Sequence, residues 1–114
     1  MLNYSGHEAD GVLVFTVEEG EIGEHSTTQR EWLYTTIETR EDPRFIIDLE
    51  AVTYMASADI GLLITLKRRI DSRKGKVAIV HVDPFIYDVL RTMRIDKLFT
   101  ITQSMVEAVA YVSS

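Results

Sequence analysis

The stretch FIIDLEAVTYMASADIGLL, residues 45–63, decides the fold. It opens with a short apolar run from Phe45 to Leu49, which is typical of a strand buried on both faces of a sheet. Ser57 then stands between small residues, and the positions after it place apolar side chains at helical spacing. The stretch therefore predicts a buried strand, a short connection, and a helix that has Ser57 as its N-cap and runs to about Ser72.

The segments on either side continue this alternation of strands and helices. Before the deciding stretch we expect strands at 4–8 and 11–17, an acidic loop at 18–24, and a helix that is capped by Ser26 and stops before Pro43. After it we expect a helix stop with Gly75 at C′, a strand at 76–81, a helix opened by Pro84, a short strand at 98–101, and a helix capped by Ser104. This order predicts an α/β fold with a mainly parallel sheet, and it leaves open whether helices cover one face or both.

Composition excludes several classes of protein. The chain has 114 residues, of which 46% are hydrophobic and 26% charged, the size and balance of one globular domain. It contains no cysteine, so a disulfide framework and a cysteine nucleophile are excluded. The net charge of −6 argues against nucleic-acid binding. Because we find neither an apolar run of membrane-spanning length nor a signal peptide, we expect a cytoplasmic protein without direct membrane insertion.

The motifs of common enzymes and cofactor sites are also missing. We find no glycine-rich nucleotide loop and no nucleophile elbow. The histidines His7, His25 and His81 lie far apart in the sequence, so a metal site would require long-range convergence. We therefore expect neither an enzyme, nor a cofactor, nor a metal site.

A basic cluster occupies the last turns of the helix that follows Ser57. Cations there suit the helix dipole, and their stems can cover apolar surface while the charged groups stay in water. A solvated face is the simpler interpretation, and a docking patch for an acidic partner is the alternative. The cluster comprises Lys67, Arg68, Arg69, Arg73 and Lys74.

Ser57 is the candidate functional residue. Its hydroxyl is expected to be accessible at a strand-to-helix turn, and a phosphate there would add about −1.5 to −2 charges. A helix N-terminus tolerates such a charge, so the surface would change more than the fold. The competing interpretation is that Ser57 is only an N-cap.

Residues 45–58 resemble the central segment of STAS domains, the anti-sigma factor antagonist family. The usual pattern there is a strand ending in Asp-Leu, a short Val-Thr segment, and then Asp-Ser-Ser-Gly-Leu-Gly opening a helix. The resemblance extends to Gly20-Glu21-Ile22, to the turn at 73–77, to Val89-Leu90, to residues 95–99 and to Glu107-Ala108. It implies a single STAS domain over residues 1–114, with a mixed, mostly parallel sheet of about five strands and four helices. It also implies that these helices lie chiefly on one face and that the first strand is at an edge.

The chain departs from the family pattern around the serine. The phosphorylated serine of the family falls on Ser57, while Ala56 replaces the preceding aspartate and Ala58 the following Ser/Thr. Asp59 stands where the first glycine is usual, and Gly23 where an earlier loop carries an aspartate. We expect Asp59 to favour the helix dipole and to repel a phosphate on Ser57.

The resemblance implies a bacterial partner-switching regulator. Such an antagonist binds an anti-sigma factor, often itself a serine kinase, and is released when Ser57 is phosphorylated; a phosphatase is a further candidate partner, and a homodimer is left open. The partner-binding surface would comprise Gly23, Glu24, Ala56, Ser57, Ala58, Asp59 and Ile60. The alternative is a non-switching STAS subunit of a larger assembly such as a lipid-transport complex. A small-molecule sensor is the third hypothesis.

Overall fold

The computed structural model describes residues 3–9, 11–18, 27–55 and 57–114. The expected cap at Ser26 and most of the expected acidic loop at 18–24 lie outside these residues. The elements run in the order β1 (Asn3–Ala9), β2 (Val12–Glu18), α1 (Thr27–Glu38), β3 (Arg44–Asp48), α2 (Ser57–Ser72), β4 (Lys76–Val80), α3 (Pro84–Thr92), a 3₁₀ turn (Ile95–Lys97), β5 (Thr100–Thr102) and α4 (Met105–Ser113). Among the described residues, no helix has both the length and the apolar character needed to cross a membrane.

One five-stranded sheet holds the strands in the order of the sequence, β1-β2-β3-β4-β5. β1 is an antiparallel edge strand beside β2, and the remaining pairs are parallel. In the register, Leu13 lies opposite Phe45, and Ile47 lies opposite Ile79. The mixed, mostly parallel sheet of about five strands predicted from the sequence is therefore confirmed, including its edge strand.

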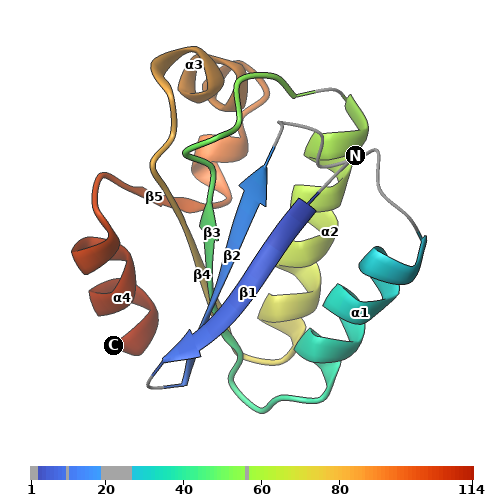
Figure 1. The fold of residues 1–114 in the computed structure, drawn as a ribbon. Coiled ribbons are helices and arrows are strands. Elements are labelled where there is room, and N and C mark those ends of the chain that lie inside the picture. Colours follow the sequence, from blue (N-terminus) through green and yellow to red (C-terminus); the bar gives the residue numbers. More distant parts are fainter. Residues whose placement is uncertain (1–2, 10, 19–26, 56) are drawn as a thin grey trace.

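Helices cover both faces of the sheet (Figure 1). The larger core lies between the sheet and α1, α2 and α3, and it contains Phe45, Ile47, Ile37, Ile70 and Leu90. α4 packs on the opposite face, where it forms the second core cluster. That second cluster comprises Val12, Val14, Ile46, Ala78, Val80, Ala108 and Val112.

The expectation that all four helices lie chiefly on one face is therefore wrong for α4. The central strands alternate apolar residues on both sides of the pleat: Phe45 and Ile47 face one core, and Ile46 faces the other. The second face must also be kept from water, and Ala108 and Val112 of α4 supply the apolar stripe that covers it.

The predicted strand at 98–101 begins later than expected. Residues 95–97 form a 3₁₀ turn after Arg94, whose φ of 61° lies in the left-handed region, and β5 starts only at Thr100. Ile95 and Phe99 are buried and anchor this turn, whereas Leu98 is exposed. Ile95 and Phe99, which lie before and after Leu98 in the chain, are packed in the core. This packing outweighs the strand preference of Leu98.

The helix α2 ends at Ser72 as predicted, but its C′ position falls one residue earlier than the predicted Gly75. The N–H of Gly75 donates to the carbonyl of Ile70 (2.9 Å) and the N–H of Lys74 to that of Asp71 (2.9 Å), the bonding pattern of a Schellman motif. Lys74, with a φ of 60°, therefore occupies C′, the position predicted for Gly75. A glycine is required at position 75 for a different reason. The backbone of Pro43, the residue before β3, lies directly beside it. A Cβ at Gly75 would overlap the carbonyl oxygen of Pro43 and would lie 2.9 Å from Cγ2 of Ile70.

Replacing Gly75 with alanine is expected to lower the free energy of unfolding by about 1–3 kcal/mol, the usual cost of overpacking. The obstructing oxygen cannot move freely, because it accepts a hydrogen bond from the N–H of Lys76 (2.8 Å). Urea denaturation measures the change. Lys74→Gly is the matched comparison and should be neutral or stabilising, because glycine relieves the left-handed backbone. A stable Gly75→Ala variant would contradict the close approach.

Candidate functional site

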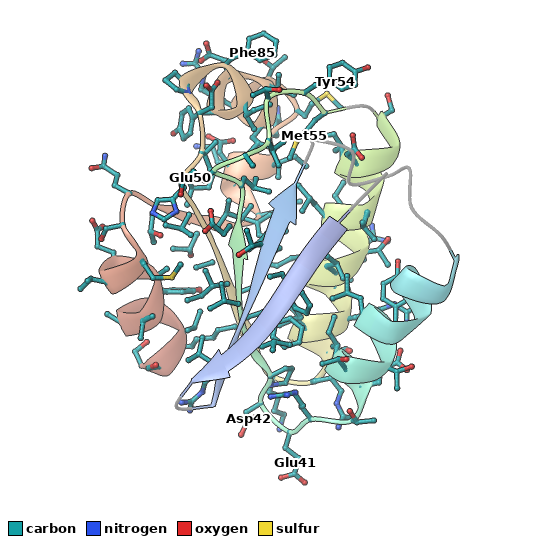
Figure 2. All side chains as sticks on the ribbon, viewed as in Figure 1. Glu41, Asp42, Glu50, Tyr54, Met55 and Phe85 are labelled. Atoms are coloured by element: carbon teal, nitrogen blue, oxygen red, sulfur yellow. The ribbon has the colours of Figure 1, made fainter. Side chains whose placement is uncertain are left out.

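Ser57 is the first residue of α2, at the end of the molecule where β3 and the other parallel strands finish (Figures 1 and 2). Its side chain is exposed. The helix α2 begins at Ser57, and the preceding Ala56 lies outside the described residues, so the N-cap role expected for Ser57 stays a prediction. The Ser57 side chain is thus exposed at the N-terminus of a 16-residue helix, where the helix dipole favours negative charge.

The next positions of α2 turn into the protein. Asp59 is only 2% exposed and Ile60 only 6%, and Ile60 belongs to the main core. Residues two apart on a helix point about 200° apart, which separates the buried Asp59 from the exposed Ser57. The expectation that Asp59 would sit directly against a phosphate on Ser57 is therefore not supported by this placement.

The predicted partner-binding set is only partly covered by the structure. Gly23, Glu24 and Ala56 lie outside the described residues, and Ala58 is described only as part of the backbone of α2. The assignment of the set stays a prediction. Of its members, Ser57 is exposed, whereas Asp59 and Ile60 turn their side chains inward.

Two exposed aromatic side chains lie at the same end of the molecule as Ser57. Tyr54, in the connection before α2, and Phe85, in the first turn of α3, are each 62% exposed (Figure 2). Sequence analysis did not single them out. Phe85 could have been recognised by its spacing, because it falls outside the buried stripe formed by Ile86 and Leu90.

The basic cluster of α2 is partly engaged within the chain. The guanidinium of Arg69 contacts the carboxylate of Glu38 and lies 4.0 Å from the ring centre of Tyr34, both on α1. Arg73 donates to the carbonyl of Arg40 (2.8 and 3.1 Å). These two arginines tie α2 to α1 and its following loop, whereas the side chains of Arg68 and Lys74 are exposed, as a solvated face requires.

Tertiary structure brings His81 to two carboxylates that are distant in the sequence. Asp48 ends β3 and His81 follows the neighbouring strand β4. Nδ1 of His81 lies 3.1 Å from Oδ1 of Asp48 and 3.5 Å from Oε2 of Glu50. The N–H of Glu50 also donates to Oδ1 of Asp48 (3.0 Å). The histidines lie far apart in the sequence, but the fold supplies for His81 the long-range convergence that a metal site would require. One signal could have predicted this contact: the carboxyl ends of neighbouring parallel strands meet at the same edge of a sheet.

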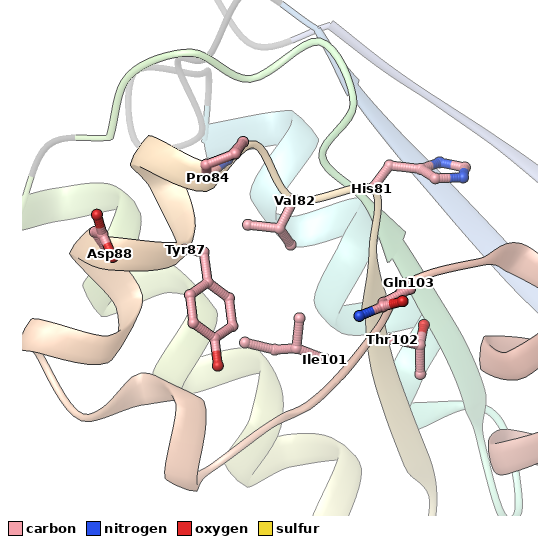
Figure 3. Close-up of a pocket in the computed structure, with 8 residues that line it drawn as sticks. All are labelled: His81, Val82, Pro84, Tyr87, Asp88, Ile101, Thr102 and Gln103. Atoms are coloured by element: carbon pink, nitrogen blue, oxygen red, sulfur yellow. The ribbon is translucent and has the colours of Figure 1, made fainter.

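A surface pocket of about 570 Å³ opens beside this cluster (Figure 3). It lies between the end of β4, α3 and β5, and its lining mixes apolar and polar groups. The ring of His81 points away from the other side chains that line it. The lining residues are His81, Val82, Pro84, Tyr87, Asp88, Ile101, Thr102 and Gln103.

Comparison with known proteins identifies the family. Residues 5–108 match the STAS domain. The chain belongs to the STAS domain family. The resemblance seen in the sequence is confirmed, and the match spans the sheet from β1 into α4.

Solved STAS structures share this fold. A STAS domain protein from Planctomyces limnophilus is 22% identical, with a TM-score of 0.81 over 97% of this chain and 98% of that chain. An anti-sigma factor antagonist from Mycobacterium paratuberculosis is 21% identical, with a TM-score of 0.74 over 100% and 96%. A sulfate transporter family protein from Wolinella succinogenes is 16% identical, with a TM-score of 0.70 over 92% and 87%. At these identities the likeness establishes the fold.

Proposed function

We propose that this STAS domain is an anti-sigma factor antagonist that acts as a partner switch, with Ser57 as the phosphate acceptor. The observation that carries the proposal is the exposed hydroxyl of Ser57 at the start of α2. The similar protein from Mycobacterium paratuberculosis, described as an anti-sigma factor antagonist, adds support. The proposed partner is an anti-sigma factor that is also a serine kinase.

A phosphate on Ser57 would change the surface of the protein and leave its fold intact. A phosphate would sit at the N-terminus of a long helix, where the helix dipole favours negative charge. Tyr54 and Phe85 give the same end of the molecule exposed aromatic area, which is the residue class enriched in protein interfaces. A charge introduced beside such a contact loses hydration when the partner docks, so binding weakens while the domain stays folded.

Two features bear on how readily Ser57 would accept phosphate. Asp59 is buried behind the helix surface, so its carboxylate does not crowd the solvent side of Ser57. Ala56 removes the carboxylate that the family pattern places directly before the serine. The kinase would therefore have to take its contacts from elsewhere on this surface.

Incubating the protein with ATP and the serine kinase encoded nearest to its gene should add one phosphate, on Ser57. Peptide mapping by mass spectrometry locates it. Ser57→Ala should take up none and stay folded, because at most about 1 kcal/mol of helix-start stability is lost. Ser104→Ala, which removes the cap hydroxyl of α4 on the other face of the sheet, should be phosphorylated like the native protein. Phosphate confined to any other residue would contradict the assignment of Ser57.

The second candidate function is a non-switching STAS subunit of a larger assembly. Ala56 and Gly23 in place of the family's aspartates favour it, because both changes remove negative charge expected at a kinase-contacting surface. The fold of the Wolinella succinogenes protein, described as belonging to a sulfate transporter family, is compatible with this alternative. Stable co-purification with a transporter complex, unchanged by Ser57→Asp, would favour it over the switch.

A further inference from the structure

We propose that Asp48, Glu50 and His81 form a binding site for one divalent transition-metal ion of the Zn²⁺ class. The inference is independent of the partner switch, since it rests on different side chains. It starts from the convergence of one imidazole and two carboxylates, whose ligand atoms all lie within 4.8 Å of one another.

The separations between the ligand atoms fit coordination. Bonds of about 2.1 Å to a common ion place neighbouring ligand atoms about 3.0 Å apart in octahedral and about 3.4 Å apart in tetrahedral geometry. Nδ1 of His81 lies 3.1 Å from Oδ1 of Asp48 and 3.5 Å from Oε2 of Glu50. Only the two carboxylates need to approach each other. The side chain of Glu50, which is 75% exposed, is free to make that adjustment.

The fold holds two of the three ligands on a rigid frame. Asp48 lies opposite Val80 in the β3–β4 register, and the N–H of Leu49 donates to the carbonyl of Val80 (3.1 Å). His81 follows directly after Val80, the last residue of β4, and its φ of 61° lies in the left-handed region. The ring of His81 points away from the side chains of the neighbouring pocket, and its Nδ1 lies within hydrogen-bond distance of Asp48 (Figure 3).

The donor set selects the class of ion. An imidazole nitrogen suits Zn²⁺, Co²⁺ and Ni²⁺, whereas Mg²⁺ and Ca²⁺ prefer oxygen ligands alone. Two carboxylates balance the charge of a divalent ion. Three protein ligands leave at least one coordination position for water, on the side that the exposed Glu50 opens to solvent.

A bound ion would link two parts of the chain that lead to different surfaces. Asp48 and Glu50 bracket the end of β3, from which the connection runs to Tyr54 and α2. His81 belongs to the start of the segment that leads into α3. Joining them stabilises the end of the sheet on which both segments are built, because the ion binds the folded arrangement and not the unfolded chain.

Isothermal titration of the tag-free protein with Zn²⁺ tests the site. We expect binding of about one ion per chain and a thermal unfolding midpoint that rises with Zn²⁺ and returns on adding a chelator. His81→Ala and Glu50→Gln should each weaken binding at least about tenfold, since even outer partners of metal ligands have effects of that size. Glu41→Gln is the matched control: it removes a carboxylate at the far end of the molecule and should bind Zn²⁺ as the native protein does (Figure 2).

Several results would overturn the site. One is the absence of Zn²⁺ binding to the native protein. Another is equal affinity in the native protein, His81→Ala and Glu50→Gln, which would show scattered surface binding. Tighter binding of Mg²⁺ than of Zn²⁺ would also overturn it, because the imidazole would then not be a ligand. If His81→Ala is poorly folded, Glu50→Gln still tests the site. The side chain of Glu50 is mostly in solvent, so this substitution should leave the fold intact.

Discussion

Replacing Phe45 with alanine should lower the free energy of unfolding by about 3–5 kcal/mol. Phe45 is 1% exposed and lies on β3 in the main core. Its ring meets the ring of Phe15 on β2 edge to face, with 5.1 Å between the centroids. Truncation removes this contact and leaves a cavity in the main core between the sheet and the helices, where the close-packed surroundings cannot easily collapse.

Urea denaturation followed by circular dichroism measures this loss. Phe85→Ala is the matched control, because it deletes the same side chain at a position that is 62% exposed. It should change the free energy of unfolding by no more than about 0.5 kcal/mol. Similar losses in the two variants would mean that the ring of Phe45 is not packed in the main core as described.

If the proposed partner switch holds, Ser57→Asp should reduce the affinity for the proposed anti-sigma factor partner by about a hundredfold or more, equivalent to about 2.8 kcal/mol. The variant carries a fixed negative charge on the exposed first residue of α2. In the free protein this charge is hydrated and favoured by the helix dipole, so folding should be unaffected. In the complex the partner displaces water from this charge, and the lost hydration lowers the binding affinity. Surface plasmon resonance with the immobilised anti-sigma factor measures the change.

Ser104→Asp is the control for this effect. Ser104 caps α4, and its hydroxyl accepts a hydrogen bond from the N–H of Glu107 (3.2 Å). The substitution adds the same charge at a helix N-terminus, where aspartate is an equally good cap, but on the helix that covers the opposite face of the sheet. Unchanged affinity in Ser57→Asp, or an equal loss in Ser104→Asp, would contradict a partner surface centred on Ser57.

Local pattern was sufficient for most elements of the fold. The apolar run at Phe45–Leu49 predicted the buried strand β3, and Ser72 was correctly placed as the end of α2. Pro84 does open α3, with Asp83 as its N-cap accepting from the N–H of Phe85 at 2.7 Å. These features depend on neighbours within a few residues, so one sequence carries them. The prediction failed for the start of β5, where packing around Leu98 outweighs its strand preference, and for the C′ position of α2, which Lys74 occupies.

The candidate functional residues likewise divide into those with a local sequence signal and those that depend on the fold. Ser57 was found from its place between a strand and a helix, because small residues and a cap are local signals. The inward turn of Asp59 follows from helix geometry but requires knowing which face of α2 is buried. The aromatic pair Tyr54 and Phe85 belongs to segments far apart in the sequence, and only the fold brings both to one end of the molecule (Figure 2).

The sequence by itself determined the alternation of strands and helices, the STAS family pattern and the position of Ser57, since each follows from residue spacing along the chain. Only the tertiary structure decided which face α4 covers, because β2, β3 and β4 are apolar on both sides and would accept a helix on either. It also decided that His81 meets Asp48 and Glu50, whose approach depends on β3 and β4 being neighbours in register. Strand pairing joins residues 33 positions apart, and no local preference of either segment encodes that contact.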